Sequence, residues 1–287
     1  MTAALLASIN VYPVKSCRGI AVTRARIAAR GLALDDKALP AGDREWMIVD
    51  GDGRFITQRE VPSLALVEIA IDHGALILSL RGAGAIEIPP ADPLDAARDV
   101  VVWGSTLPAH DAGPEAAAWL AAALGVAARL VRFDAVHERR CNPQFVGDSG
   151  AHTMFADAYP LLVTSEASLA DLNERITESA GAGPALPMNR FRPNLVLSGL
   201  PAWDEDHLDT IEADGVTIKL VKPCTRCVTT TTDQATGLRG IEPLPTLARF
   251  RTNDALGGVT FGMNAIVVSG IGRAIAVGSS VRCTYRF

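Results

Sequence analysis

The sequence of 287 residues predicts a mostly β protein with some helix, of the α+β class. Short apolar runs separated by turn residues fill roughly the first 80 positions, and this pattern is typical of strands. Helical periodicity is confined to residues 114–124 and 165–176. Hydrophobic residues make up 48% of a chain long enough for two modest domains, so we expect a β-rich, barrel-like domain over residues 1–125 and a second domain over 126–287.

Strands dominate the predicted first domain. Residues 5–12 form an apolar run that ends at Pro13, which lacks the backbone N–H that a strand needs. Residues 46–57 predict a hairpin, because the Asp-Gly pairs at positions 50–53 supply the positive φ of a tight turn. Residues 64–80 predict a second hairpin around His73-Gly74, and residues 100–103 predict a further strand.

The first helix and the following strand lie near the domain boundary. Pro114 suits the first helical position and Gly125 suits the stop, so residues between them predict a helix. Residues 128–133 then read as a strand. We place the boundary between Gly125 and His137.

The second domain alternates strands with one longer helix. Residues 160–164 form a short buried strand, and it leads into the helix 165–176, in which Leu169, Leu172 and Ile176 share one face. Further strands are predicted by four apolar runs, at 195–197, 216–221, 259–268 and 274–281.

Composition excludes several function classes. The net charge is −5 and there is no basic run, which argues against nucleic acid as the partner. No apolar stretch reaches the roughly 20 residues of a membrane-spanning helix. The first residues lack the basic region of a signal peptide, and five cysteines do not suggest a disulfide framework. We therefore expect a cytoplasmic protein.

A Cys-x-x-Cys motif is the most reactive feature of the sequence. Cys224 and Cys227 are flanked by Lys222 and Arg226, whose positive charge favours the thiolate. The β-branched residues 228–232 place the motif at the mouth of a strand, whereas a thioredoxin-like motif runs into a helix. A structural zinc site needs four ligands, and the other three cysteines stand singly. Two ordinary buried thiols remain an alternative.

Polar, cationic and hydroxyl side chains gather at the ends of several predicted elements, where binding sites are usually built. Each has a plain alternative reading, such as a solvated turn residue, a surface ion pair or a helix cap. Together they predict a pocket for an anionic ligand beside the thiolate of Cys227. The residues are Lys15, Ser16, Arg44, Thr164, Ser165, Arg192 and Asn194.

The sequence resembles a known family at five ordered stretches. These are Val11-Tyr12-Pro13-Val14-Lys15-Ser16-Cys17-Arg18-Gly19, Asp43-Arg44, residues 162–169 (Leu-Val-Thr-Ser-Glu-Ala-Ser-Leu), Arg190-Phe191-Arg192-Pro193-Asn194, and Cys224-Thr225-Arg226-Cys227 with Thr230-Thr231-Thr232-Asp233. Together they are similar to the MOSC proteins with an N-terminal MOSC β-barrel domain, the family that includes the mitochondrial amidoxime-reducing component.

The resemblance implies a MOSC β-barrel packed on a β-rich N-terminal domain, with the molybdenum cofactor (molybdopterin) bound between them. It implies that Cys227 is both the metal ligand and the catalytic thiolate, and that Cys224 is a neighbour. The implied cofactor-binding residues are Lys15, Ser16, Arg44, Thr164, Ser165, Arg192 and Asn194. A soft thiolate suits molybdenum, and a cationic rim suits a phosphorylated pterin.

The resemblance also implies an activity: the reduction of small N-hydroxylated compounds such as amidoximes, hydroxylamines and N-hydroxylated bases. The remaining cysteines lack iron–sulfur spacing, so the electrons are expected from a separate protein, which could be a flavoprotein, a haem protein or an iron–sulfur protein. The alternative function is that of a carrier for the cofactor or for sulfur, using the two thiols of the motif.

Overall fold

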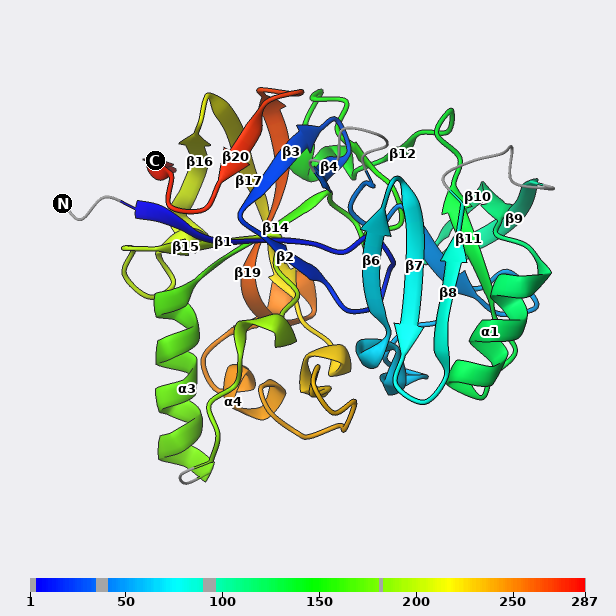
Figure 1. Ribbon diagram of the computed structural model, residues 1–287. Helices are drawn as coiled ribbons and strands as arrows, with labels where there is room; N and C mark the ends of the chain where they lie inside the picture. The colour runs from blue at the N-terminus through cyan, green and yellow to red at the C-terminus, as the bar shows by residue number, and fades with distance from the viewer. Residues whose placement is uncertain (1–3, 35–40, 90–96, 181–182, 287) are drawn as a thin grey trace.

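The computed structural model describes residues 4–34, 41–89, 97–180 and 183–286. Its centre is a closed barrel of seven strands, in which β19 pairs back onto β14 (Figure 1). All neighbouring strands of the barrel are antiparallel except β14 and β15, which are parallel. In barrel order the strands are β14 (Leu161–Ser165), β15 (Leu195–Ser198), β1 (Ala4–Val11), β21 (Ser280–Tyr285), β16 (Leu208–Ala213), β17 (Val216–Thr225) and β19 (Gly258–Ser269).

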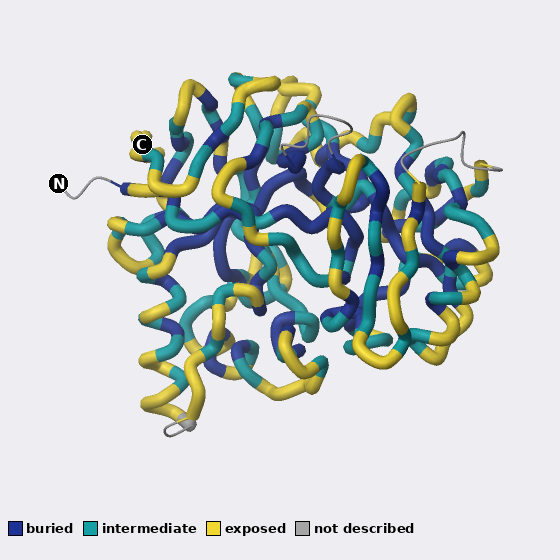
Figure 2. Tube along the Cα trace, in the orientation of Figure 1, coloured by how far each residue is buried: buried dark blue, intermediate teal, exposed yellow. Residues whose placement is uncertain are grey.

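The barrel interior is filled by alternate side chains of its strands. In β1 the buried positions change from even to odd numbers, since Leu6 and Ile9 both face the core. The pairing with β15 shifts register between Leu6 and Ser8, and such a bulge moves the following side chains to the other face. The buried segments run through the middle of the molecule, and the surface loops are exposed (Figure 2).

Smaller sheets build the rest of the molecule. A four-stranded sheet and the three-stranded sheet β6–β7–β8 pack around further apolar clusters, with α1 against β8 and β11. The four-stranded sheet runs β5 (Trp46–Val49), β11 (Arg129–Phe133), β10 (Ser105–Asp111) and β9 (Ala97–Val102). The other strands are β2 (Ile20–Val22), β3 (Arg24–Ala28), β4 (Gly31–Leu34), β6 (Glu68–Asp72), β7 (Ala75–Leu80), β8 (Gly84–Ile88), β12 (Arg139–Arg140), β13 (His152–Thr153), β18 (Thr252–Asn253) and β20 (Ala274–Ala276).

Helices are few among the described residues. The α-helix α1 and the α-helix α3 lie at opposite ends of the molecule (Figure 1). The α-helices are α1 (Pro114–Leu124), α2 (Pro143–Val146), α3 (Glu166–Ala180) and α4 (Leu244–Ala248). The 3-10 helices are η1 (Pro62–Leu66), η2 (Met188–Arg190), η3 (Asp204–His207), η4 (Val228–Thr231) and η5 (Asp254–Leu256). Within the described ranges, no helix is long and apolar enough to cross a membrane.

The two halves of the chain exchange strands across the predicted boundary. β1, from the first half, pairs with β15 and β21 of the barrel. β11 lies after residue 125, yet it pairs with β5 and β10 of the first half. The barrel is therefore completed by the N-terminal strand, and the four-stranded sheet is completed by a strand from beyond the boundary.

The predicted fold class is confirmed, and most of the predicted elements are present. The strand expected at 274–281 is divided into β20 and β21. The strand expected over residues 228–232 is wrong, because these residues form η4. The hydroxyls of Thr230 and Thr231 donate to the carbonyls of Cys227 and Val228, at 2.9 and 2.8 Å. Such local bonds compete with strand pairing.

Candidate active site

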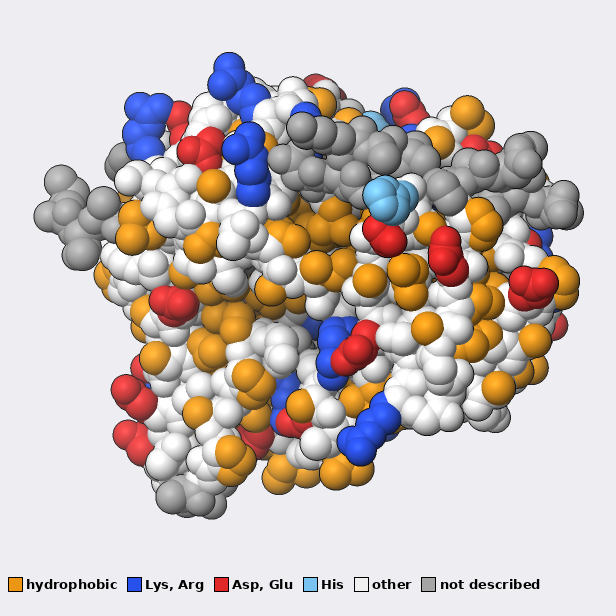
Figure 3. Space-filling model, in the orientation of Figure 1, with side chains coloured by type: hydrophobic (Ala, Val, Ile, Leu, Met, Phe, Trp, Pro, Cys, Tyr) orange, Lys and Arg blue, Asp and Glu red, His pale blue; other side chains and the backbone are white. Residues whose placement is uncertain are grey.

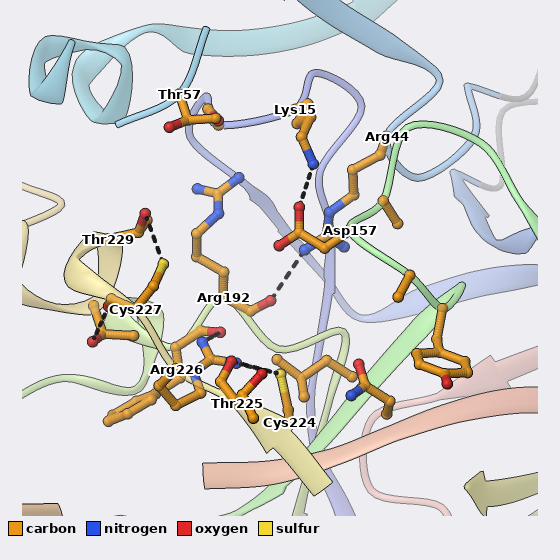
Figure 4. A pocket seen from close by; sticks show the side chains of 18 of the residues that line it. Lys15, Arg44, Thr57, Asp157, Arg192, Cys224, Thr225, Arg226, Cys227 and Thr229 are labelled. Carbon is orange, nitrogen blue, oxygen red and sulfur yellow. Dashed lines mark hydrogen bonds and ion pairs between the residues drawn. The ribbon is translucent and has the colours of Figure 1, made fainter. Parts of the chain in front are cut away.

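A pocket lies between the barrel and the N-terminal sheets, and both halves of the chain line it. Among the residues predicted from the sequence, the structure brings together Lys15, Ser16, Arg44, Arg192, Asn194 and Cys227. Figure 4 shows Lys15, Arg44, Arg192 and the two cysteines around this pocket. Lys and Arg side chains are scattered over the face shown in Figure 3 and do not gather into a large patch. The pocket itself is lined by several cationic side chains, including Lys15, Arg44, Arg59 and Arg192.

Four lining residues have a left-handed backbone. The φ angles of Ser16, Arg44, Trp103 and Arg192 are 69°, 51°, 54° and 54°. Positive φ is unfavourable for residues with a Cβ, and such residues concentrate at binding sites, where the surrounding structure compensates for the strain. The turns that carry these four residues place their side chains in the lining of the same pocket.

Arg44 and Asn194 belong to a hydrogen-bond network around the buried carboxylate of Asp43. Arg44 forms an ion pair with the buried Asp43, and its guanidinium also donates to Asn194 Oδ1 at 3.1 Å. Asn194 Nδ2 donates to Asp43 Oδ1 at 2.9 Å, and Asn194 Oδ1 accepts the N–H of Leu162 at 3.1 Å. The amide of Asn194 is thus bonded on both sides. Its contacts tie β15 to the loop that carries Arg44.

Arg192 differs from Arg44 and Asn194, because part of its guanidinium makes no hydrogen bond to the described residues. Its Nη2 is buried and has no hydrogen-bond partner among the described residues, while Nη1 reaches Gln234 Oε1 only at 3.5 Å. The guanidinium carbon lies 4.4 Å from the centroid of the Tyr12 ring. Burial lowers the pKa of Arg192 to about 10. A buried cation with an unbonded donor in a pocket fits an anionic ligand such as a phosphate.

Lys15 is paired with a carboxylate that the sequence analysis did not select. Its Nζ lies 2.5 Å from Asp157 Oδ1 and 2.9 Å from the carbonyl of Phe155. Burial lowers the pKa of Lys15, and the charge of Asp157 partly offsets this effect. Arg139 holds the same loop, because its Nη2 donates to the Asp157 carbonyl at 2.8 Å. Asp157 therefore faces the pocket from a fixed loop.

The two cysteines differ in their surroundings. Cys224 is the penultimate residue of β17, and its Sγ accepts a hydrogen bond from Arg226 Nη1 at 2.9 Å. Cys227 precedes η4, and its Sγ lies 3.4 Å from Thr229 Oγ1. Burial raises the pKa of Cys227, but hydrogen bonds from Thr229 and the charge of Arg59 outweigh burial and leave the pKa lowered. This environment favours the thiolate of Cys227.

Thr164, Ser165 and Lys222 do not line the pocket. Thr164 and Ser165 are fully buried at the end of β14, and Thr164 Oγ1 donates to Met188 Sδ at 3.3 Å. Lys222, which the sequence suggested as a charge beside the cysteines, has its Nζ 4.7 Å from the ring centroid of Phe145. A direct contact of Thr164 or Ser165 with a ligand stays a prediction without a geometric counterpart.

Arg59, Trp103 and Asp157 are among the pocket-lining residues that sequence reasoning missed. Asp157 lies in the short segment before β14, so the rule that found Lys15 at an element end also applies to it. Trp103-Gly104 joins β9 and β10 in a two-residue turn, a position where tryptophan is unusual. Nothing in the sequence near Arg59 distinguishes it from a surface residue.

The donor set fits an anionic cofactor that brings its own metal ligands. The described residues contain no cluster of three or more His, Cys, Asp or Glu that could hold a metal ion. The thiols of Cys224 and Cys227 both face a pocket that contains Lys15, Arg44, Arg59 and Arg192, and the surroundings of Cys227 lower its pKa. One soft protein ligand and several cations match a metal held mainly by a phosphorylated organic group.

Comparisons with known proteins identify the family of this chain. Residues 3–127 match the MOSC N-terminal beta barrel domain, and residues 150–282 match the MOSC domain. Mitochondrial amidoxime reducing component 2 of Bos taurus is 34% identical over 249 residues, which cover 85% of this chain and 71% of the relative. Mitochondrial amidoxime-reducing component 1 of Homo sapiens is 34% identical over 255 residues, which cover 87% and 72%. The chain therefore belongs to the family of MOSC proteins with an N-terminal MOSC barrel, to which the mitochondrial amidoxime-reducing components are related.

Proposed function

We propose that this protein is a molybdenum-cofactor-dependent reductase of N-hydroxylated compounds and takes its electrons from a separate donor protein. The names of its relatives support an amidoxime substrate. The observation that carries the proposal is the unbonded, buried Nη2 of Arg192 in a pocket that also contains the activated thiol of Cys227. This combination suits a phosphorylated cofactor whose metal takes one protein thiolate.

The residues of the pocket divide into two roles. Lys15, Ser16, Arg44 and Arg192 would hold the cofactor's anionic groups, with Arg44 fixed in place by Asp43 and Asn194. Cys227 would be the protein ligand of the metal. When bound, the cofactor supplies the two-electron chemistry that breaks the N–O bond. The overall reaction consumes two electrons and two protons, converts N–OH to N–H and releases water.

The test is reduction of benzamidoxime by protein purified from a host that makes molybdenum cofactor. We expect turnover with a reduced viologen dye and none with NADH alone, because the electrons must come from an external donor. Turnover with NADH and no second protein would contradict the need for a donor. A protein that holds molybdenum near stoichiometry but reduces no N-hydroxylated compound would contradict the proposed activity.

The second candidate is a carrier of cofactor or sulfur. Cys224 favours it, since its partly exposed Sγ lines the same pocket and accepts a bond from Arg226 at 2.9 Å. A carrier releases its load to an acceptor, whereas a reductase keeps its cofactor during repeated turnover. Molybdenum content measured before and after turnover separates the two functions.

A cytoplasmic location also stays a prediction, since the named relatives are mitochondrial.

A further inference from the structure

Trp103 occupies a backbone position that is unfavourable for it. It is the first residue of the two-residue turn between β9 and β10, where Val102 pairs with Ser105, and its φ is 54°. Turns of this kind favour Asn, Asp or Gly, because a larger residue is strained at positive φ. A tryptophan in such a turn suggests that its side chain serves a purpose other than folding.

The indole of Trp103 is fixed by three neighbours and still open to the pocket. Its Nε1 donates to Asp157 Oδ1 at 3.2 Å. The Phe55 ring centroid is 5.1 Å from that of Trp103, and the Arg59 guanidinium carbon is 4.5 Å from it. Nevertheless Trp103 is 43% exposed and lines the pocket. A rigid, exposed aromatic surface costs little entropy to a ligand that packs against it.

Arg59 connects this surface to the reactive end of the pocket. Its guanidinium packs on the Trp103 ring, and Arg59 and Cys227 line the same pocket, close enough for the charge of Arg59 to act on the thiol. One side chain thus separates the indole from the thiol that is the proposed metal ligand. A small ligand held with its N-hydroxylated group near Cys227 would therefore have its other end beside Trp103.

We infer that Trp103 determines substrate specificity and favours N-hydroxylated groups that are attached to a planar aromatic ring. The inference rests on the proposed reductase function and names its substrate class. Aromatic rings pack on an indole face or edge more favourably than a methyl group of much smaller area does. Asp157 is the positioning residue, because its carboxylate holds the indole N–H and is itself held by Lys15.

The experiment compares benzamidoxime with acetamidoxime, which carries a methyl group in place of the ring. Trp103→Asn removes the indole and suits a positive φ, so the turn is expected to form. Trp103→Phe keeps an aromatic ring. Trp119→Phe is the matched control, since Trp119 lies on α1, donates to the Ala83 carbonyl at 3.2 Å and does not line the pocket.

The readout is the ratio of kcat/KM for benzamidoxime to kcat/KM for acetamidoxime. We expect this ratio to fall about tenfold in Trp103→Asn, mainly through KM, and by much less in Trp103→Phe. The control variant should keep the wild-type ratio. An unchanged ratio in Trp103→Asn would overturn the inference. A lower molybdenum content in the same variant would also overturn it, because the indole would then serve the cofactor.

A binding measurement tests the inference even if the protein reduces neither amidoxime. Benzamidine and acetamidine lack the N–O bond, so they can be titrated without turnover while tryptophan fluorescence is recorded. Benzamidine should quench part of the emission in the wild type but not in Trp103→Phe, and acetamidine should quench little in either. Equal quenching by benzamidine in both proteins would overturn the role of Trp103, whatever the outcome for the reductase function.

Discussion

Arg192 combines a fixed backbone with an unsatisfied side chain. Its carbonyl accepts a hydrogen bond from Arg44 at 3.2 Å and its guanidinium packs on Tyr12, whereas its Nη2 has no partner in the part of the chain that the structure describes. A desolvated cation that lacks a counter-charge opposes folding, and a bound anion relieves that cost. We therefore propose that Arg192 serves a bound anion more than it serves the stability of the fold.

Replacing this side chain should separate stability from cofactor retention. Arg192→Ala removes a half-buried charge that has no ion-pair partner among the described residues, so we expect the thermal midpoint of the cofactor-free protein to stay unchanged or to rise. Retained pterin should fall about tenfold, because one or two charge-assisted hydrogen bonds are lost. Arg192→Lys keeps the positive charge but loses the guanidinium group that can donate two parallel hydrogen bonds. Its retained pterin should therefore lie between that of the wild type and that of Arg192→Ala. A variant that unfolds, yet holds normal pterin whenever it is folded, would make Arg192 a structural residue.

Glu205 predicts a dependence of stability on pH. Its carboxyl group is fully buried, Oε2 accepts a hydrogen bond from Ser168 at 2.7 Å, and Oε1 has no partner within the described ranges. Burial raises the pKa of Glu205 to about 7. The folded state thus holds a proton that the unfolded state loses near pH 4.5, and stability falls as the pH rises from there through 7.

Glu205→Gln should remove this part of the pH dependence. At pH 8 the variant should be more stable than the wild type by about 2 kcal/mol, since no charge has to be buried. At pH 5 the two should be nearly equal. The measurement is urea unfolding of both proteins at the two pH values. A variant that is destabilised equally at the two pH values would show that Glu205 is not protonated in the folded state.

At the scale of elements, the seam between β14 and β19 closes the barrel. Gly262 of β19 has a φ of 73°, and a Cβ there would lie 2.7 Å from both the Val163 carbonyl oxygen and Thr164 Cγ2. The close approach of the two strands therefore depends on the missing side chain. Gly257 has a similar φ of 67° but open space around its Cβ position.

These two glycines give a matched pair of variants. Gly257→Ala adds only the strain of a positive φ and should cost about 1 kcal/mol. Gly262→Ala adds a backbone clash to the same strain, so its cost should exceed that of the control by roughly 2 kcal/mol. Chemical denaturation of both variants measures the difference. Equal costs would mean that β14 can move away from β19 without penalty.

Periodic elements could be predicted from the sequence, and those shaped by local side-chain bonds could not. The stripe of Leu169, Leu172 and Ile176 predicted α3, since burial on one face leaves a regular pattern. The threonines after Cys227 looked like a strand, but their hydroxyls bond nearby carbonyls and form η4. Lys15 and other pocket residues could be predicted because they are polar residues at the ends of predicted elements. Trp103 reaches the pocket through packing between distant strands, which leaves no local pattern.

At the scale of the molecule, the two halves are joined by strands and by the pocket itself. β1 pairs with β15 and β21 of the barrel, and Arg239 Nη2 donates to the carbonyls of Gln58 and Arg59 at 2.7 and 2.8 Å. Gln58 and Gln234 bond each other across the same interface. The position of Arg59 beside Cys227 therefore depends on contacts between the halves.

The shared strand predicts the behaviour of fragments. A fragment of residues 126–287 lacks β1, so the edges of β15 and β21 would stay unpaired. We expect this fragment to show no cooperative unfolding transition, while the whole chain unfolds in one transition. Circular dichroism during heating measures both. A fragment that unfolds cooperatively, at a midpoint near that of the whole chain, would show that the barrel closes without β1.

Molybdenum content in two cysteine variants tests the central claim, that Cys227 is the protein ligand of a molybdenum cofactor held in this pocket. Both thiols are partly exposed and neither is in a disulfide, so Cys227→Ser and Cys224→Ser should both fold. Serine offers a hard, mostly protonated oxygen in place of a soft thiolate. With protein from a host that makes the cofactor, we predict that molybdenum is lost in Cys227→Ser and kept in Cys224→Ser. Equal loss in both variants, or loss only in Cys224→Ser, would contradict the account.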